Sequence, residues 1–369
     1  MRAVIPLLIV LLVAGALFLT YSKSSSTNDD DKDLNFSLEV ENIVNEILEK
    51  VKNDRDESDN AQKELVWVGQ SAVPYLKRAL KSDDKAVVIV AARALRDIDG
   101  DESLKDIVQA YVKSKNTTQI HLGQIIQTYD KKALPYLYKE LTNEDDLTRY
   151  WVVDLIAHIG LEESLDVLKK RYEVETSDKV KLQIIRAIYR KDTENQKEYL
   201  EFVHKMLETN DEFTKCAAIF LISELKDESK VEFLKKCFTD ESANIRMFAI
   251  ISIVNFDRDD YIPDLIKLIS HEDVNTSCTV IRELGYKSNL SQEFKEDIKK
   301  ALIKALASKE MRVRYAAVSA LADYDDLNII PHLEQIAEND SDEKVRARAK
   351  NAIVEVKTNN ANKTQTKPR

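Results

Sequence analysis

The stretch that decides the fold is MRVRYAAVSALADY, residues 311–324, followed after a short acidic turn by IIPHLEQIA, residues 329–337. The first part carries apolar residues at the spacing of one face of an α-helix: Val313, Ala317, Ala320, Leu321 and Tyr324. Pro331 stands near the start of the second part, where a helix tolerates the missing N–H. The stretch therefore predicts two helices joined by a short turn.

The same pattern recurs along most of the chain. Successive positions equivalent to Leu321 lie 30 to 37 residues apart, namely Leu65, Leu95, Ile126, Ile156, Ile188, Leu221, Ile253, Leu284, Leu321 and Ile353. A near-constant period of this length indicates a stacked repeat protein. A proline, followed two residues later by leucine, marks four of the second helices: Pro74, Pro135, Pro263 and Pro331. We therefore predict an all-α fold, a right-handed α-solenoid of about ten antiparallel helix pairs.

At three of these stretches the chain resembles the HEAT-repeat family, specifically the short variety found in phycobilin-lyase-like proteins. The stretches are AVPYL at 72–76, VVIVAARAL at 87–95 and VRYAAVSAL at 313–321. The resemblance covers roughly residues 60–356 and implies a scaffold that unrelated activities share. It also implies a ladder of Asp and Arg between repeats. The Arg positions here read Val88, Gln119, Arg149, Lys181, Thr214, Arg246, Ser277, Arg314 and Arg346, so we expect a partial ladder.

The ends of the chain differ from the repeats in composition. Residues 3–21 form an uncharged run of 19, close to the ~20 that cross a bilayer. We predict that residues 1–21 are a membrane anchor or signal segment, with the solenoid outside the cytoplasm. The alternative is a secreted or periplasmic protein released by cleavage. Residues 22–36 are predicted to be a disordered polar linker, 37–356 the HEAT-like solenoid and 357–369 a disordered basic tail.

The net charge disfavours some classes of binding partner. The chain has 369 residues and a formal net charge of −10. Because a nucleic-acid backbone needs a basic surface, this balance disfavours nucleic acid as a partner. It also disfavours contact with an anionic membrane beyond the N-terminal segment. Basic or neutral protein partners are left, with nothing in the sequence to identify them.

We find no arrangement of residues that points to catalysis. There is no glycine-rich phosphate loop, no Gly-x-Ser-x-Gly, no Cys-x-x-Cys and no His-Glu-x-x-His. Some HEAT-repeat enzymes bind iron through several His-Glu dyads, but this chain has only His271-Glu272, so we predict no metal, cofactor or catalytic residue. The cysteines Cys216, Cys237 and Cys278 fit small buried hydrophobes, and a disulfide between the first two is open.

One side of the inner helices is unusually apolar. Residues two positions after each core anchor should face the concave side: Ile89, Ile120, Tyr150, Leu182, Lys215, Met247, Cys278, Tyr315 and Ala347. Eight of these nine are uncharged, and Ile219, Ile222, Ile251 and Val254 extend the row. Either the row is a hydrophobic groove for a partner, or a neighbouring helix covers it. The candidate partner-binding residues are Tyr150, Leu182, Ile219, Ile222, Met247, Ile251 and Tyr315.

These observations predict a non-enzymatic protein-binding scaffold, membrane-tethered or exported, that binds its partner on the concave helical face. The alternative is a lyase-like HEAT-repeat protein, or one that carries a cofactor or small ligand in the same groove.

Overall fold

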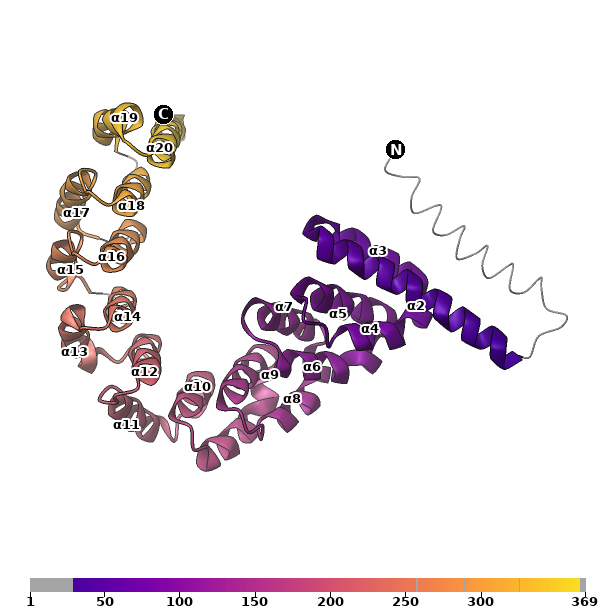
Figure 1. Ribbon diagram of the computed structural model, residues 1–369. Coiled ribbons are helices and arrows are strands. Elements are labelled where there is room, and N and C mark those ends of the chain that lie inside the picture. Colours follow the sequence, from indigo (N-terminus) through magenta and orange to yellow (C-terminus); the bar gives the residue numbers. More distant parts are fainter. Residues whose placement is uncertain (1–28, 257, 288–289, 325, 366–369) are drawn as a thin grey trace. The chain divides into compact units, whose positions relative to one another are not determined.

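The computed structural model describes residues 29–256, 258–287, 290–324 and 326–365, and every regular element within these ranges is a helix. The all-α prediction is therefore confirmed. The chain divides into two compact units, Met1–Ile188 and Tyr189–Arg369, which we call unit 1 and unit 2. Figure 1 shows the helices of each unit stacked as successive antiparallel pairs.

In unit 1 the helices α3, α5, α7 and α9 pack against one another in succession, and α4, α6 and α8 alternate with them along the chain. The bounds are α2 (Asp29–Asn53), α3 (Ser58–Val68), α4 (Val73–Ala79), α5 (Lys85–Asp99), α6 (Leu104–Lys113), α7 (Asn116–Gln127), α8 (Leu134–Glu140), α9 (Asp146–Val174) and α10 (Asp178–Ile188). Helix α9 is two helices of one repeat, because Gly160 interrupts it with non-helical backbone at φ −165° and ψ 72°. A Cβ at Gly160 would lie 3.0 Å from Leu134 Cδ1, so this close approach favours glycine.

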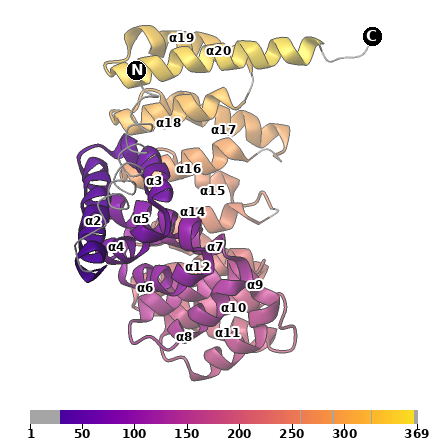
Figure 2. The ribbon, with the colours of Figure 1, turned by 90° about the vertical axis from the view of Figure 1, so that its right-hand side faces the viewer.

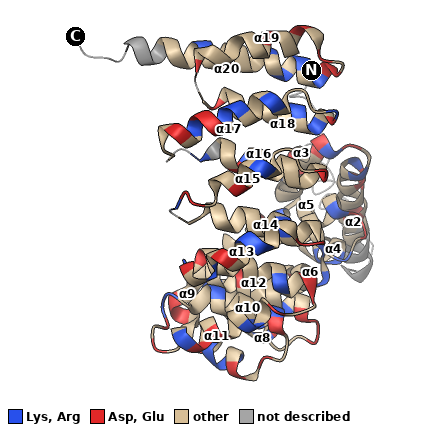
Figure 3. Ribbon diagram, turned by 90° about the vertical axis from the view of Figure 1, so that its left-hand side faces the viewer, with Lys and Arg blue, Asp and Glu red and all other residues tan. Residues whose placement is uncertain are grey.

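Unit 2 contains five complete helix pairs within its described part. One layer, here the A-layer, consists of α12 (Glu212–Glu224), α14 (Ala243–Val254), α16 (Val274–Tyr286), α18 (Met311–Ala322) and α20 (Glu343–Gln365). The B-layer consists of α11 (Gln196–Met206), α13 (Val231–Lys236), α15 (Ile262–Leu268), α17 (Gln292–Ala305) and α19 (Ile330–Asn339). Figure 2 shows the pairs α17–α18 and α19–α20 stacked on one another. Charges of both signs are interspersed over the B-layer helices, as expected of solvated faces (Figure 3).

The predicted core positions explain why these segments are helices that pack in pairs. Val313, Ala317 and Leu321 are each at most 4% exposed on α18. Small residues among them let neighbouring helices approach closely, while the larger ones fill the space between layers. The prolines that mark the second helices stand in the first turn of α4, α8, α15 and α19, as predicted. The sequence pattern and the observed packing therefore agree.

Short polar residues cap most of the helices that pack in succession. The side chains of Asp84, Asp145, Asp211, Ser242 and Asp273 accept hydrogen bonds from backbone N–H groups in the first turns of α5, α9, α12, α14 and α16. A cap of this kind contributes about 0.5–2 kcal/mol to helix stability. Helix α7 departs from this pattern, because its N-cap is Lys115 and that side chain makes no capping hydrogen bond.

The expected partial ladder is present as three rungs, each joining an Arg to a carboxylate of the following turn: Arg149–Glu175, Arg246–Asp273 and Arg314–Asp340. In each rung the same guanidinium also donates to two carbonyl oxygens in the turn before its own helix. A planar guanidinium with five donors suits such a shared position. Each rung therefore ties two successive turns together through one side chain.

Two boundaries differ from the sequence prediction. Helix α2 begins at Asp29, inside the segment predicted as a disordered linker, and α20 continues to Gln365, inside the predicted disordered tail. The acidic run at the start of α2 and the apolar stripe after it favour a helix start at this point, since negative charge is stabilising at a helix N-terminus. The structure thus moves both ends of the helical region outwards.

The predicted localisation needs correction. The proposed anchor, residues 3–21, lies outside the described residues. Across the ranges that the structure describes, no helix combines the length and the apolar character needed to cross a membrane. The predicted membrane anchoring is therefore contradicted by the part of the chain that the structure describes.

The sequence alignment also contains one register error, at α12. This helix is capped by Asp211, and the buried position three residues later is Thr214, which is 5% exposed. Phe213 stands eight residues before Leu221, as Val313 stands before Leu321, but it is 48% exposed. The repeat position assigned to Leu221 therefore belongs to Ile222. A one-residue shift rotates the inferred face by about 100° on a helix, so inferences about neighbouring side chains change as well.

Candidate functional site

An apolar groove lies on the A-layer of unit 2, across α16, α18 and the start of α20. It has a volume of about 460 Å³. Its lining residues are Cys278, Arg282, Gly285, Met311, Arg312, Tyr315, Ala316, Ser319, Ala320, Asp323 and Lys344. The volume is in the range of pockets that hold a small ligand or a few side chains of a partner. We call this feature the unit-2 groove.

The floor of the unit-2 groove is made by a close approach of two helices. A Cβ added at Gly285 on α16 would lie 2.8 Å from the Cβ of Ala320 on α18. Real side chains essentially never come this close, so the approach requires glycine at this position. The small residues leave room above them, and Tyr315 stands beside that room with 42% of its surface exposed. The groove therefore combines a shallow apolar floor with one exposed aromatic side chain.

Basic residues predominate at the edge of the groove. Arg312 donates to Asn275 Oδ1 at 3.1 Å, and Arg282 pairs with Glu283 at 2.9 Å. Lys344 has no ion-pair partner within the described ranges. With Asp323 as the one carboxylate in the lining, the edge carries three cationic groups. This arrangement favours an apolar group with carboxylates beside it.

Cys278 is the one cysteine in the lining. It is half-buried, and burial raises the pKa of its thiol, which the nearby Arg312 and Arg282 only partly offset. Cys216 and Cys237 are buried free thiols elsewhere in unit 2, and burial raises the pKa of each to about 11. All three thiols are therefore mostly protonated at neutral pH. No disulfide joins Cys216 to Cys237 in the structure.

The residues predicted to bind a partner fall into two classes. Leu182, Ile219 and Ile222 are at most 2% exposed and belong to the core. For the last two the cause is the register error at α12, which placed core positions on the outer face. Burial of Leu182 shows that this part of the apolar row is packing, as the second interpretation had it. None of these three side chains is reachable by a partner without unfolding.

The other four candidates are accessible, but they do not form one site. Tyr150 is half-buried in unit 1, where its ring makes an edge contact with Trp151 at 5.2 Å between centroids. Met247 and Ile251 are half-buried on α14, and neither lines the unit-2 groove. Tyr315 alone lies in it. The structure therefore supports one residue of the predicted set as part of a groove.

Sequence reasoning missed most of the lining. Met311 lies one turn before Tyr315 on the same side of α18, a spacing that the sequence contains and that would have found it. Arg282 and Lys344 come from other helices, and only the packing of α16 and α20 brings them to the edge. Among the residues that the structure describes, no group of three or more His, Cys, Asp or Glu could hold a metal ion.

Comparison with known proteins finds one family match and several distant structural likenesses. Residues 262–353 match the family described as HEAT repeats. No curated protein matches the sequence. Among solved structures, the chain is similar to an engineered protein at 20% identity, with 90% of this chain and 97% of that one covered and a TM-score of 0.36.

Two natural proteins show a similar likeness. Kap121p, solved bound to Pho4p, matches at 14% identity over 87% of this chain and 41% of that one, with a TM-score of 0.43. YibA from E. coli matches at 14% identity over 76% of this chain and 92% of that one, with a TM-score of 0.39. Likeness at this level does not carry over to function.

The family assignment rests on the matched repeats together with the helix pairs of the structure. The matched range holds α15, α16, α17, α18 and α19 with the first part of α20, which are the pairs that build the unit-2 groove. The match is to HEAT repeats in general, so the short variety of the repeat stays a prediction. Residues 262–353 therefore carry HEAT repeats, and the helix pairs described outside this range have the same all-α arrangement.

Proposed function

We propose that this protein is a non-enzymatic scaffold that binds a protein partner through the unit-2 groove. The observation that carries the proposal is the exposed Tyr315 ring beside the apolar floor of a groove with a volume of about 460 Å³. An exposed apolar patch with a polar rim is typical of an interaction site. Tyr in such a place supplies a large contact area at low cost in conformational entropy.

The charges at the edge specify the chemistry of the partner. Arg282, Arg312 and Lys344 surround an apolar floor that holds a single carboxylate, Asp323. A segment that fits must therefore present a large apolar side chain with Asp or Glu close to it. Burial of that side chain would contribute at about 25 cal/mol per Å², less the costs of association. The acidic neighbours would add orientation and faster association.

A peptide selection tests this proposal without knowledge of the natural partner. The full chain is used to select from a random peptide library, and selected peptides are counter-selected on Ala316→Glu. Ala316 lines the groove and is only half-buried, so the variant should fold. We expect selected peptides to share an apolar residue beside acidic ones and to lose at least tenfold in affinity for the variant.

The control replaces an exposed aromatic residue far from the groove in sequence. Trp67 is 72% exposed on α3, and Trp67→Ser should leave the affinity of the selected peptides unchanged. Peptides that bind Ala316→Glu as well as the original chain would refute the assignment of the groove. Loss of binding in Trp67→Ser would move the site to unit 1.

A further inference from the structure

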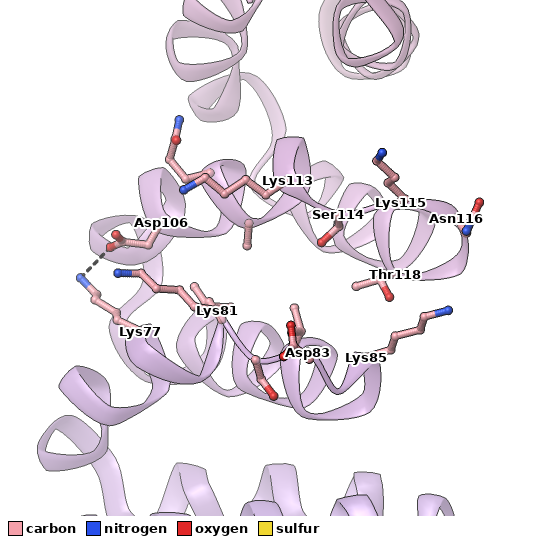
Figure 4. Close-up of a pocket in the computed structure, with 15 residues that line it drawn as sticks. Lys77, Lys81, Asp83, Lys85, Asp106, Lys113, Ser114, Lys115, Asn116 and Thr118 are labelled. Atoms are coloured by element: carbon pink, nitrogen blue, oxygen red, sulfur yellow. Dashed lines mark ion pairs between the residues drawn. The ribbon is translucent and has the colours of Figure 1, made fainter. Parts of the chain in front are cut away.

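A second pocket lies in unit 1, between the pair α4–α5 and the pair α6–α7. Its volume is about 560 Å³. Five lysines and two aspartates line it: Lys77, Lys81, Lys85, Lys113, Lys115, Asp83 and Asp106. Figure 4 shows Ser114 and Thr118 between the two helix pairs, with the side chains of Lys81 and Lys113 on one side of them and Lys85 on the other. The pocket is therefore cationic on a chain whose net charge is −10.

Most of these lysines are not neutralised. Lys77 pairs with Asp106 at 3.1 Å and with Asp99 at 3.6 Å. The other four lysines of the lining have no ion pair within the described part of the chain. Five lysines against two aspartates leave an excess of positive charge, so the pocket gains from an added anion.

The start of α7 holds a threonine hydroxyl whose equivalents in α9 and α16 donate to a capping aspartate. Thr148 donates its hydroxyl hydrogen to the capping carboxylate of Asp145 at 2.6 Å, and Thr276 does the same to Asp273 at 2.6 Å. The equivalent residue of α7 is Thr118, and its cap is Lys115 instead of an aspartate. Thr118 is 5% exposed, and its hydroxyl makes no hydrogen bond to any described residue. A buried hydroxyl without a partner costs about 1–3 kcal/mol.

The missing rung of the ladder explains why the space is open. In the rung at α14, Arg246 donates to Asp273 at 2.8 Å and to Thr276 Oγ1 at 3.0 Å, which fills the space between two successive turns. The position equivalent to Arg246 in α5 is Val88, which lines the pocket. Val88 thus stands in place of Arg246, and Lys115 stands in place of Asp273. Both the guanidinium and the carboxylate are therefore absent from the same place.

We propose that this pocket binds a phosphate monoester, which takes the place of the missing capping carboxylate. One oxygen would accept from the Thr118 hydroxyl and from the first free N–H groups of α7, as anions do at helix N-termini. The remaining oxygens would face the ammonium groups of the lining. A phosphate fits better than a carboxylate, because it carries about −1.5 to −2 charges and three terminal oxygens. The pocket volume leaves room for the esterified group as well.

Replacing the unusual cap tests the proposal. Lys115→Asp installs the capping carboxylate that α5, α9, α12 and α16 have, so it should raise the melting temperature of the full chain and abolish phosphate binding. The probe is inorganic phosphate at constant ionic strength, followed by thermal unfolding and by NMR of the Thr118 amide. We expect phosphate to raise the melting temperature of the original chain and not that of the variant. Equal stabilisation of both proteins by phosphate would overturn the proposal.

A second variant separates the hydroxyl from the charge. Thr118→Val keeps the shape and removes the unpaired hydroxyl, so the unliganded protein should fold and be at least as stable. Because a hydrogen bond to a charged group contributes about 1.5–3 kcal/mol, phosphate affinity should fall by roughly tenfold or more. The control for the charge change in Lys115→Asp is Lys350→Asp, at an exposed position within α20. This control should leave the affinity for phosphate unchanged. Unchanged affinity in Thr118→Val would contradict the assigned geometry.

A phosphopeptide distinguishes whether the natural ligand is a phosphate ester or free phosphate. An arbitrary peptide with one phosphoserine is compared with inorganic phosphate and with the same peptide carrying glutamate. If the phosphopeptide binds more tightly than inorganic phosphate, the ligand is a phosphate ester. If inorganic phosphate binds as tightly as the phosphopeptide, the ligand is the free ion. Equal binding of the glutamate peptide would overturn the preference for phosphate. The site lies apart in sequence from the unit-2 groove, so Ala316→Glu should not affect any of these results.

Discussion

Arg149 donates two hydrogen bonds to Glu175, from Nε to Oε2 at 2.9 Å and from Nη2 to Oε1 at 2.7 Å. The Glu175 side chain is fully buried, and Arg171 donates to it as well, at 2.7 Å. Burial alone would raise the pKa of Glu175, but the hydrogen bonds from Arg149, from the Ser177 amide and from Arg171 outweigh burial and lower this pKa to about 2. Unit 1 thus holds a buried carboxylate between two guanidinium groups.

This arrangement predicts an acid-sensitive contribution to stability. Because the folded-state pKa is depressed, the contribution is present above the unfolded value of 4.5 and is lost as pH falls towards about 2. Glu175→Gln should lower the free energy of unfolding by roughly 3–5 kcal/mol at neutral pH. In this variant the urea midpoint should also change less between pH 4.5 and about pH 2 than it does in the original chain. Glu163→Gln removes an exposed pair with Lys131 and should leave the free energy of unfolding almost unchanged. Similar losses in the two variants would contradict the special role of the buried rung.

The close approach of α16 and α18 predicts a steric effect. Gly285→Ala would place a Cβ 2.8 Å from that of Ala320, so we expect a loss of about 1–3 kcal/mol in the free energy of unfolding. Ala320→Gly in the same chain should recover part of the loss, because it restores the space. A double-mutant cycle by chemical denaturation measures this coupling. Strictly additive effects would mean that the helices separate instead of clashing.

The corrected register of α12 predicts opposite results for two glutamates. Ile222→Glu would bury an unpaired carboxylate and should collapse the unfolding transition of unit 2, because Ile222 has no exposed surface. Tyr315→Glu adds the same charge at a residue that is 42% exposed and should leave the helical content near normal. Circular dichroism during heating measures both. A tolerated glutamate at position 222 would restore the first register.

The cysteines predict a graded reactivity. Cys278 is half-buried in the unit-2 groove, whereas Cys216 and Cys237 are each 5% exposed. Under native conditions a small alkylating reagent should modify Cys278 first and the other two only on unfolding. Because burial raises the pKa of every thiol, the rate at Cys278 should still be increasing above pH 9. Mass spectrometry of timed samples measures the order. Peptides that occupy the groove should slow the reaction at Cys278 and leave the buried pair unchanged.

The sequence determined the fold well because the repeat pattern is local. Pro331 and the stripe that begins at Val313 fix a helix pair without knowledge of any other part of the chain. The site was harder to predict, because the unit-2 groove depends on which helices meet. Nothing in the sequence near Gly285 states that Ala320 lies against it. The error at α12 has a physical cause too: Thr214, a polar residue, holds a core position, so the apolar spacing does not mark the register there.

The broken rung at α5 and α7 bears on how binding sites arise in such repeats. Two substitutions, Val88→Arg and Lys115→Asp, would convert the unit-1 pocket into an ordinary rung like that of Arg246 and Asp273. The reverse path is equally short: any rung in the array lies two point mutations from an open, polar cavity. The stability lost on removing one rung is confined to the repeats around it, because each repeat contacts only its neighbours. New recognition sites can therefore arise in one repeat while the remaining repeats keep the scaffold folded.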